Sequence, residues 1–155
     1  MILMRRAHCE QIHNHAFETY PEECCGLLLG KINNNEKQVI EVRSTPNSWN
    51  LHNEENLPHI LSFNTKKLSK ENRFSIAPKV ILKIQKEARN LELQIIGVYH
   101  SHPNYPAIPS EFDRAIAWPE YSYIIVSLQP SKTTDLKSWY LDDKGQFQAE
   151  EFQIT

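Results

Sequence analysis

The sequence predicts an α+β fold of three layers, in which a mixed β-sheet lies between helices. The candidate elements run in the order helix, strands, helix, strands along the 155 residues, and this order is typical of such layered domains. The strongest strand candidates, residues 25–30, 95–99 and 121–128, are apolar runs that a sheet buries on both faces. Because domains commonly hold about 100–200 residues and no internal repeat is visible, we expect a single domain over residues 1–155.

The first half of the chain predicts one helix and one hairpin. Residues 5–19 carry apolar side chains at helical spacing, and the residue before Pro21 is pushed out of the α region, which ends that helix. A strand over 25–30 and an alternating strand over 38–44 flank an Asn-rich turn at 33–35. This pattern is typical of a β-hairpin.

Residues 47–72 differ from the rest because they are rich in Asn, Ser, Lys and Glu and have no clear period. Long irregular stretches inside compact domains are uncommon and often functional, so we expect a variable insertion loop here. A short strand is predicted at 74–76. Pro78 then begins an amphipathic helix, since proline is favoured in the first turn.

The second half alternates strands with one short helix. An apolar strand runs directly into the polar residues 100–103, and a proline-rich loop follows it. A turn at 142–145 separates the last two strand candidates. We expect a helix over 110–117 and strands over 95–99, 121–128, 138–141 and 147–154.

Composition excludes several classes of protein. The chain has 17 basic and 19 acidic residues, a net charge of -2, and nucleic-acid or membrane-surface proteins normally show a basic excess. No apolar run approaches the roughly 20 residues of a membrane span, and residues 1–6 lack the apolar region of a secretory signal. We therefore expect no nucleic-acid or membrane partner.

Cysteine usage predicts a reducing compartment. The 3 cysteines comprise Cys9 and the adjacent pair Cys24 and Cys25, which is no disulfide framework. We expect a cytoplasmic protein. Cys25 leads into an apolar strand, where a buried cysteine usually acts as a small hydrophobe rather than a nucleophile.

The residues that carry chemistry are His100, His102 and Asp113. Side chains at i and i+2 of a strand point to one face, so two imidazoles at the end of a strand can reach one ion. Asp113 follows on the first turn of the next predicted helix, and the loop between can fold back to add a carboxylate. Two histidines, a carboxylate and a water match a catalytic zinc sphere with one open position.

Simpler interpretations exist for the same residues. Ser110 and Asp113 match a helix capping box, with serine as N-cap and the acid at the third helical position, and this interpretation is compatible with metal binding. His13 and His15 have the same spacing as the candidate ligands but lie in a predicted helix, so their rings should diverge. We expect them on a solvated polar face.

Three sequence segments together resemble a known family. The run H-S-H-P at 100–103, followed by S-E-F-D at 110–113, is similar to the JAMM motif of MPN-domain metallopeptidases. The family also has an upstream glutamate, which residues 21–30, P-E-E-C-C-G-L-L-L-G, match in small prokaryotic members. By this match Glu23 is the corresponding glutamate, and Glu22 is the rival assignment. The resemblance implies a JAB/MPN fold of the cytidine-deaminase-like architecture.

The resemblance implies a zinc hydrolase of amide bonds. His100, His102 and Asp113 would hold one Zn2+ per chain, which lowers the pKa of a bound water. Glu23 would take the proton of that water and pass it to the leaving amine. Ser110 would donate its hydroxyl to the oxyanion.

The small prokaryotic members are associated with ubiquitin-like or sulfur-carrier proteins that end in Gly-Gly, so the resemblance implies such a partner and an isopeptidase or peptidase activity. Two alternatives stay open. One is a non-catalytic MPN scaffold, although members of that kind lack the metal ligands. The other is a RadC-type DNA-repair-associated protein, whose H-N-H-P-S-G signature differs from residues 100–105 here. The sequence leaves open whether two copies form a homodimer.

Overall fold

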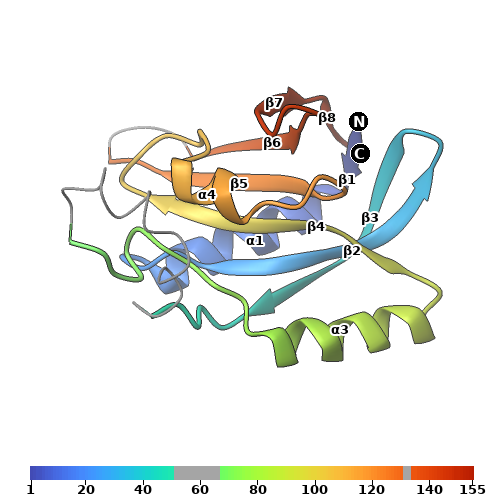
Figure 1. Cartoon of the computed structure of the whole chain (residues 1–155), viewed down its shortest axis with the longest axis horizontal. Coiled ribbons are helices and arrows are strands. Elements are labelled where there is room, and N and C mark those ends of the chain that lie inside the picture. Colours follow the sequence, from blue (N-terminus) through green and yellow to red (C-terminus); the bar gives the residue numbers. More distant parts are fainter. Residues whose placement is uncertain (51–66, 131–133) are drawn as a thin grey trace.

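The structure is a computed structural model that describes residues 1–50, 67–130 and 134–155. It has a mixed eight-stranded sheet flanked by helices, as the sequence predicts (Figure 1). The helices are α1 (Arg6–Thr19), α3 (Pro78–Asn90) and α4 (Glu111–Ile116). The strands are β1 (Ile2–Met4), β2 (Cys25–Asn33), β3 (Glu36–Thr45), β4 (Gln94–Pro103), β5 (Ser122–Leu128), β6 (Asp135–Leu141), β7 (Phe147–Glu150) and β8 (Phe152–Ile154).

The sheet curls until its two outer strands meet. Its order is β7-β6-β5-β4-β2-β3-β1-β8, so β7 and β8 are at opposite ends although only Glu151 separates them in the chain. The Ile2 amide donates to the Glu151 carbonyl at 2.9 Å, and Figure 1 shows β7, β8 and β1 gathered together. The parallel pairs are β4 with β5 and β1 with both β3 and β8, which makes the sheet mixed.

Each face of the sheet has its own hydrophobic core. On one face, α1 packs Ile12 and Ala16 against residues that include Leu28 and Ile96. On the other face, α3 and α4 contribute Ile84, Ala88 and Phe112, which pack with the alternate positions of β2 and β4. Figure 1 shows α1 behind the sheet and α4 in front of it. The predicted three layers are therefore present.

The hairpin of β2 and β3 depends on a close backbone approach. The two strands pair antiparallel around Asn34, which has a positive φ of 56°. A Cβ added at Gly30 would lie 1.9 Å from the Gln38 carbonyl oxygen, next to a register shift in the pairing. Only glycine fits this position.

Two strand predictions are wrong. Residues 74–76 form no strand, because the Ser75 carbonyl accepts from the Ser48 amide (2.8 Å) and its amide donates to the Asn47 side chain (3.2 Å) rather than to the sheet. Residues 147–154 form two strands, because the chain crosses at Glu151 from one edge of the sheet to the other. β1 was not predicted, since three residues carry no measurable period.

The expectation for His13 and His15 is also wrong in part. Both lie in α1, but they are half-buried rather than solvated. His15 Nδ1 lies 2.7 Å from the hydroxyl of Tyr99 on β4. His15 therefore connects α1 to the sheet.

Most of the predicted insertion 47–72 lies outside the described residues, since residues 51–66 are not described. Its last residues form a tight turn, in which the Asn72 Oδ1 accepts from the Ser69 amide at 3.1 Å. Within the described ranges no helix is both long and apolar enough to cross a membrane.

Candidate metal centre and active site

The end of β4 carries His100 and His102 into the buried centre of the molecule. β4 lies between β2 and β5, where His100 pairs with Cys25 and Ile125. A position in the middle of the sheet explains why the side chains of His100 and His102 are only 0% and 1% exposed. Both rings point to the face that α3 and α4 cover, as the strand period requires.

Asp113 reaches the histidines from the first turn of α4. The Ser110 Oγ accepts from the Asp113 amide at 3.1 Å, and the Ser110 amide donates to the Asp113 Oδ2 at 2.9 Å. This reciprocal pair is the capping box that the sequence predicts. The cap fixes the start of the helix and holds the carboxylate in place at once.

The three side chains form a compact group of ligand atoms. The two Nε2 atoms of His100 and His102 lie 3.1 Å apart, and each lies 3.2 Å from a different oxygen of Asp113. Two atoms bound at about 2.0–2.1 Å to a tetrahedral zinc ion lie roughly 3.3 Å apart. These donors therefore suit one tetrahedral ion, and they could hold a metal.

The second nitrogen of each imidazole has a different environment. His102 Nδ1 lies 2.7 Å from the Pro106 carbonyl, which can only accept, so Nδ1 carries the proton and Nε2 offers its lone pair. His100 Nδ1 is buried with no hydrogen-bond partner among the described residues. Its ring instead stacks on Phe74, with centroids 4.4 Å apart and planes at 19°.

The pKa shifts of Asp113 and His100 favour the protonation states that bind a metal ion. Burial raises the pKa of Asp113, but the adjacent His100 and His102 outweigh this and hold its pKa well below its usual range. Burial lowers the pKa of His100, with Asp113 opposing in part. A neutral imidazole beside a charged carboxylate is the protonation state in which both act as ligands.

Glu23 lies two residues before the start of β2 and is 2% exposed, whereas Glu22 is exposed to solvent. The Tyr105 hydroxyl donates a hydrogen bond to Glu23 Oε2. Burial raises the pKa of Glu23 well above its usual value, and the negative charge of Asp113 adds to this, while Tyr105 and Arg73 oppose it. The geometry thus favours Glu23 over Glu22 as the acidic residue of the site.

The main chain around Glu23 is held from both sides. The Glu23 amide donates to the Lys70 carbonyl at 2.7 Å, and the Asn47 Nδ2 donates to the Glu23 carbonyl at 3.0 Å. On β4, the Ser101 Oγ accepts from the Cys24 amide at 2.7 Å. The serine between the two histidines therefore ties Cys24, the residue after Glu23, to the strand that carries them.

Several residues of the site were not predicted. Tyr105 packs on His102 with ring centroids 4.5 Å apart, and Phe74 packs on His100. Arg73 is 5% exposed and lies over the Phe112 ring at 4.6 Å. A single arginine between Asn72 and Phe74 gives no distinct pattern in a sequence, and only the fold brings residues 73 and 112 together.

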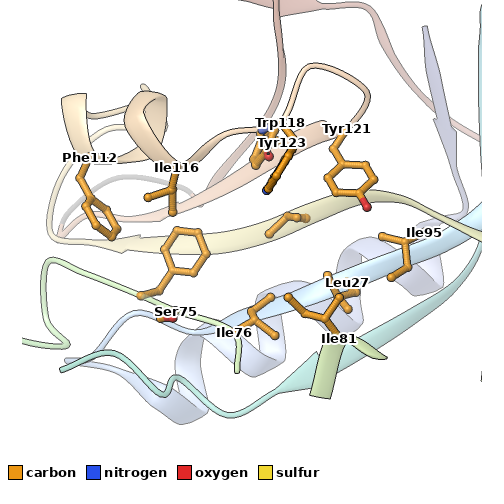
Figure 2. Close-up of a pocket in the computed structure, with 12 residues that line it drawn as sticks. Leu27, Ser75, Ile76, Ile81, Ile95, Phe112, Ile116, Trp118, Tyr121 and Tyr123 are labelled. Carbon is orange, nitrogen blue, oxygen red and sulfur yellow. Dashed lines mark hydrogen bonds between the residues drawn. The ribbon is translucent and has the colours of Figure 1, made fainter. Parts of the chain in front are cut away.

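An apolar cavity of about 300 Å3 adjoins the site. Figure 2 shows Phe112 and Ile116 of α4 on one side of it, with Ile76 and Ile81 on the other (Figure 2). Phe74 and Phe112 line the cavity, Phe74 stacks on His100, and Phe112 precedes Asp113. The cavity and the candidate metal centre therefore share a wall.

Cys24 and Cys25 are poorly suited to act as nucleophiles. Cys24 and Cys25 are 1% and 0% exposed. Burial raises the pKa of Cys24 to about 12 and that of Cys25 to about 11. Both thiols therefore stay protonated at neutral pH, and a thiol is a weak nucleophile.

The curled mixed sheet, the covering helices and the His-His-Asp group define a domain of the JAB class. The family described as prokaryotic homologs of the JAB domain matches residues 5–142, and the chain belongs to this family. It is also similar to the desampylase of Pyrococcus furiosus, with 27% identity over 125 residues that span 79% of this chain and 69% of that protein.

Solved structures agree with this assignment. The chain is similar to a Desulfitobacterium hafniense protein solved in solution, with a TM-score of 0.79 and 28% identity over 100% of this chain and 93% of the other. A Salinibacter ruber protein solved in solution gives a TM-score of 0.67 and 25% identity over 100% and 92%.

Proposed function

We propose that this protein is a zinc-dependent peptidase or isopeptidase. Its substrate would be a ubiquitin-like or sulfur-carrier protein, cleaved at the amide bond after a C-terminal Gly-Gly. The observation that carries the proposal is the group of three side chains, His100, His102 and Asp113, in which each Nε2 lies 3.1 Å from the other Nε2 and 3.2 Å from one oxygen of the carboxylate. Membership of the JAB family and the desampylase relative support the same reaction class.

The residues of the chain divide the chemistry between them. His100, His102 and Asp113 would hold the ion, which when bound acidifies a water and polarises a carbonyl. Glu23 accepts a proton at its carboxylate and returns it to the leaving amine, a role that its raised pKa suits. Ser110 accepts from Asp113 through Oγ, and this leaves its hydroxyl proton for the developing oxyanion.

The proposed partner and compartment follow from the same observations. A Gly-Gly tail has no side chains, so it can approach a site whose ligands are buried, as His100 and His102 are. Cys9, Cys24 and Cys25 are free thiols, which supports a reducing cytoplasm. We also propose that residues 1–155 act as one domain.

The test compares Glu23→Gln with Glu22→Gln. Glu23 carries no role in holding the ion, so Glu23→Gln should keep full zinc and near-normal stability yet lose nearly all turnover, because an amide cannot take a proton at neutral pH. Glu22 is exposed, so Glu22→Gln should stay active. Zinc content and cleavage of Gly-Gly-tailed carriers with C-terminal extensions are measured in parallel.

Three results would contradict parts of the proposal. Zinc loss in Glu23→Gln would make Glu23 a ligand. An inactive Glu22→Gln beside an active Glu23→Gln would exchange the two assignments. A zinc-loaded wild type that cleaves no carrier would support the non-catalytic scaffold instead.

A further inference from the structure

Tyr105 lies in the loop between β4 and α4 and is held at three points. Its ring packs on His102 at a tilt of 32°, with centroids 4.5 Å apart. Its carbonyl accepts from the Ser127 Oγ at 2.6 Å. Its hydroxyl donates to Glu23 Oε2. The loop therefore places one phenol between a candidate ligand and the acidic residue of the site.

The hydrogen bond to Glu23 is the main polar contact of this hydroxyl. The next acceptor is the Glu71 carbonyl at 3.5 Å, the limit of a hydrogen bond. A phenol is protonated at neutral pH, so it donates to the carboxylate rather than accepting from it. One oxygen of Glu23 is thus occupied by this donor, and among the described residues the other oxygen accepts no hydrogen bond.

The main chain of Glu23 has its own supports, which do not involve Tyr105. Asn47 and Lys70 bind its carbonyl and amide. What these bonds leave undetermined is the side chain, whose several torsions could aim the carboxylate in different directions. A polar contact at the carboxylate itself selects among these directions.

We propose that Tyr105 is a positioning residue for Glu23. By holding Oε2, its hydroxyl directs Oε1 toward the place where the proton is taken. This inference rests on the proposed function of Glu23 as the base. A misplaced reacting group can lower a rate by about 100-fold. A contact that fixes the orientation of this carboxylate therefore matters for the rate.

The test is Tyr105→Phe, which removes the hydroxyl and keeps the ring against His102. Zinc content should stay full. We expect kcat to fall by about 10-fold to 100-fold, with KM within about 2-fold, since binding of the tail does not use this hydroxyl. Crystals of the zinc-free variant should show the Glu23 carboxylate in a new or divided orientation, with its main chain unmoved.

Tyr99→Phe is the matched control. It removes a hydroxyl from a tyrosine of β4 that bonds to His15 at 2.7 Å on the opposite face of the sheet. Tyr99→Phe should lower the free energy of unfolding by about as much as Tyr105→Phe does, and it should keep the wild-type kcat. If kcat falls in Tyr105→Phe but not in Tyr99→Phe, the cause is therefore the lost contact with Glu23 and not a general loss of stability.

Five outcomes decide between these possibilities. A fall in kcat with a displaced carboxylate supports the positioning role. Wild-type kcat in Tyr105→Phe overturns it, as does an unmoved Glu23 or a large rise in KM with kcat unchanged. If the zinc-loaded wild type is itself inactive, the proposed function fails. The carboxylate orientation in the zinc-free crystals still decides whether Tyr105 positions Glu23.

Discussion

Asn47 uses every hydrogen-bonding position of its side chain at the site. Its Nδ2 donates to the carbonyls of Glu23 and Arg73 at 3.0 and 2.9 Å. Its Oδ1 accepts from the amides of Trp49 and Ser75 at 3.1 and 3.2 Å. An amide offers two donors and two acceptor positions, so one residue joins three separate segments. A change of type here leaves at least one buried backbone group without a partner.

Ser110 caps α4 through its Oγ, and in the proposed function the same hydroxyl also donates to the oxyanion. Ser110→Ala should lower the free energy of unfolding by about 1 kcal/mol, because the cap is lost. It should also reduce turnover roughly 10²–10³-fold, because the oxyanion loses a donor. Urea denaturation of the zinc-free protein and kcat of the zinc-loaded protein measure the two effects. Ser110→Thr keeps the hydroxyl and should be mild; unchanged turnover in Ser110→Ala would leave only the cap.

At the scale of elements, the hairpin of β2 and β3 depends on Gly30. Gly30→Ala should destabilise the protein by about 3 kcal/mol or more, because the new methyl meets the Gln38 backbone and Ile96 Cδ1 at 2.7 Å. Gly145→Asn is the control, since Gly145 has a positive φ of 72° that asparagine tolerates and open space around it. Thermal unfolding compares both, and equal Tm values would contradict the steric argument.

The elements that the sequence predicts well are those defined locally. An apolar run predicts β4, and a capping box predicts the start of α4. The candidate ligands belong to these two elements. The contacts of Tyr105 and Asn47 with Glu23 join residues 82 and 24 positions apart. The periodicities of helices and strands relate residues only a few positions apart, so these contacts could not be predicted without the fold.

The whole molecule should lose stability in mild acid when zinc is absent. Burial lowers the pKa of His8, His13, His15 and His100. The unfolded chain therefore takes up protons below about pH 6.5 that the folded state does not, and stability falls as the pH falls. Glu23 acts in the opposite direction, because its raised pKa gives stability that is lost as the pH rises.

Because four described histidines oppose one glutamate, we expect the Tm of the zinc-free protein to decrease from about pH 7.5 to about pH 5.5. Differential scanning calorimetry across this range measures it. A Tm that rises on acidification would mean that Glu23 outweighs the histidines.

The meeting of the outer strands also bears on how copies of the protein behave at high concentration. An exposed strand edge is a template on which another chain can add, and repeated addition leads to cross-β fibres. Here the outer strands β7 and β8 have only 4 and 3 residues and turn toward each other at Glu151. In the part of the chain that the structure describes, the folded sheet thus offers little edge on which fibre growth could start.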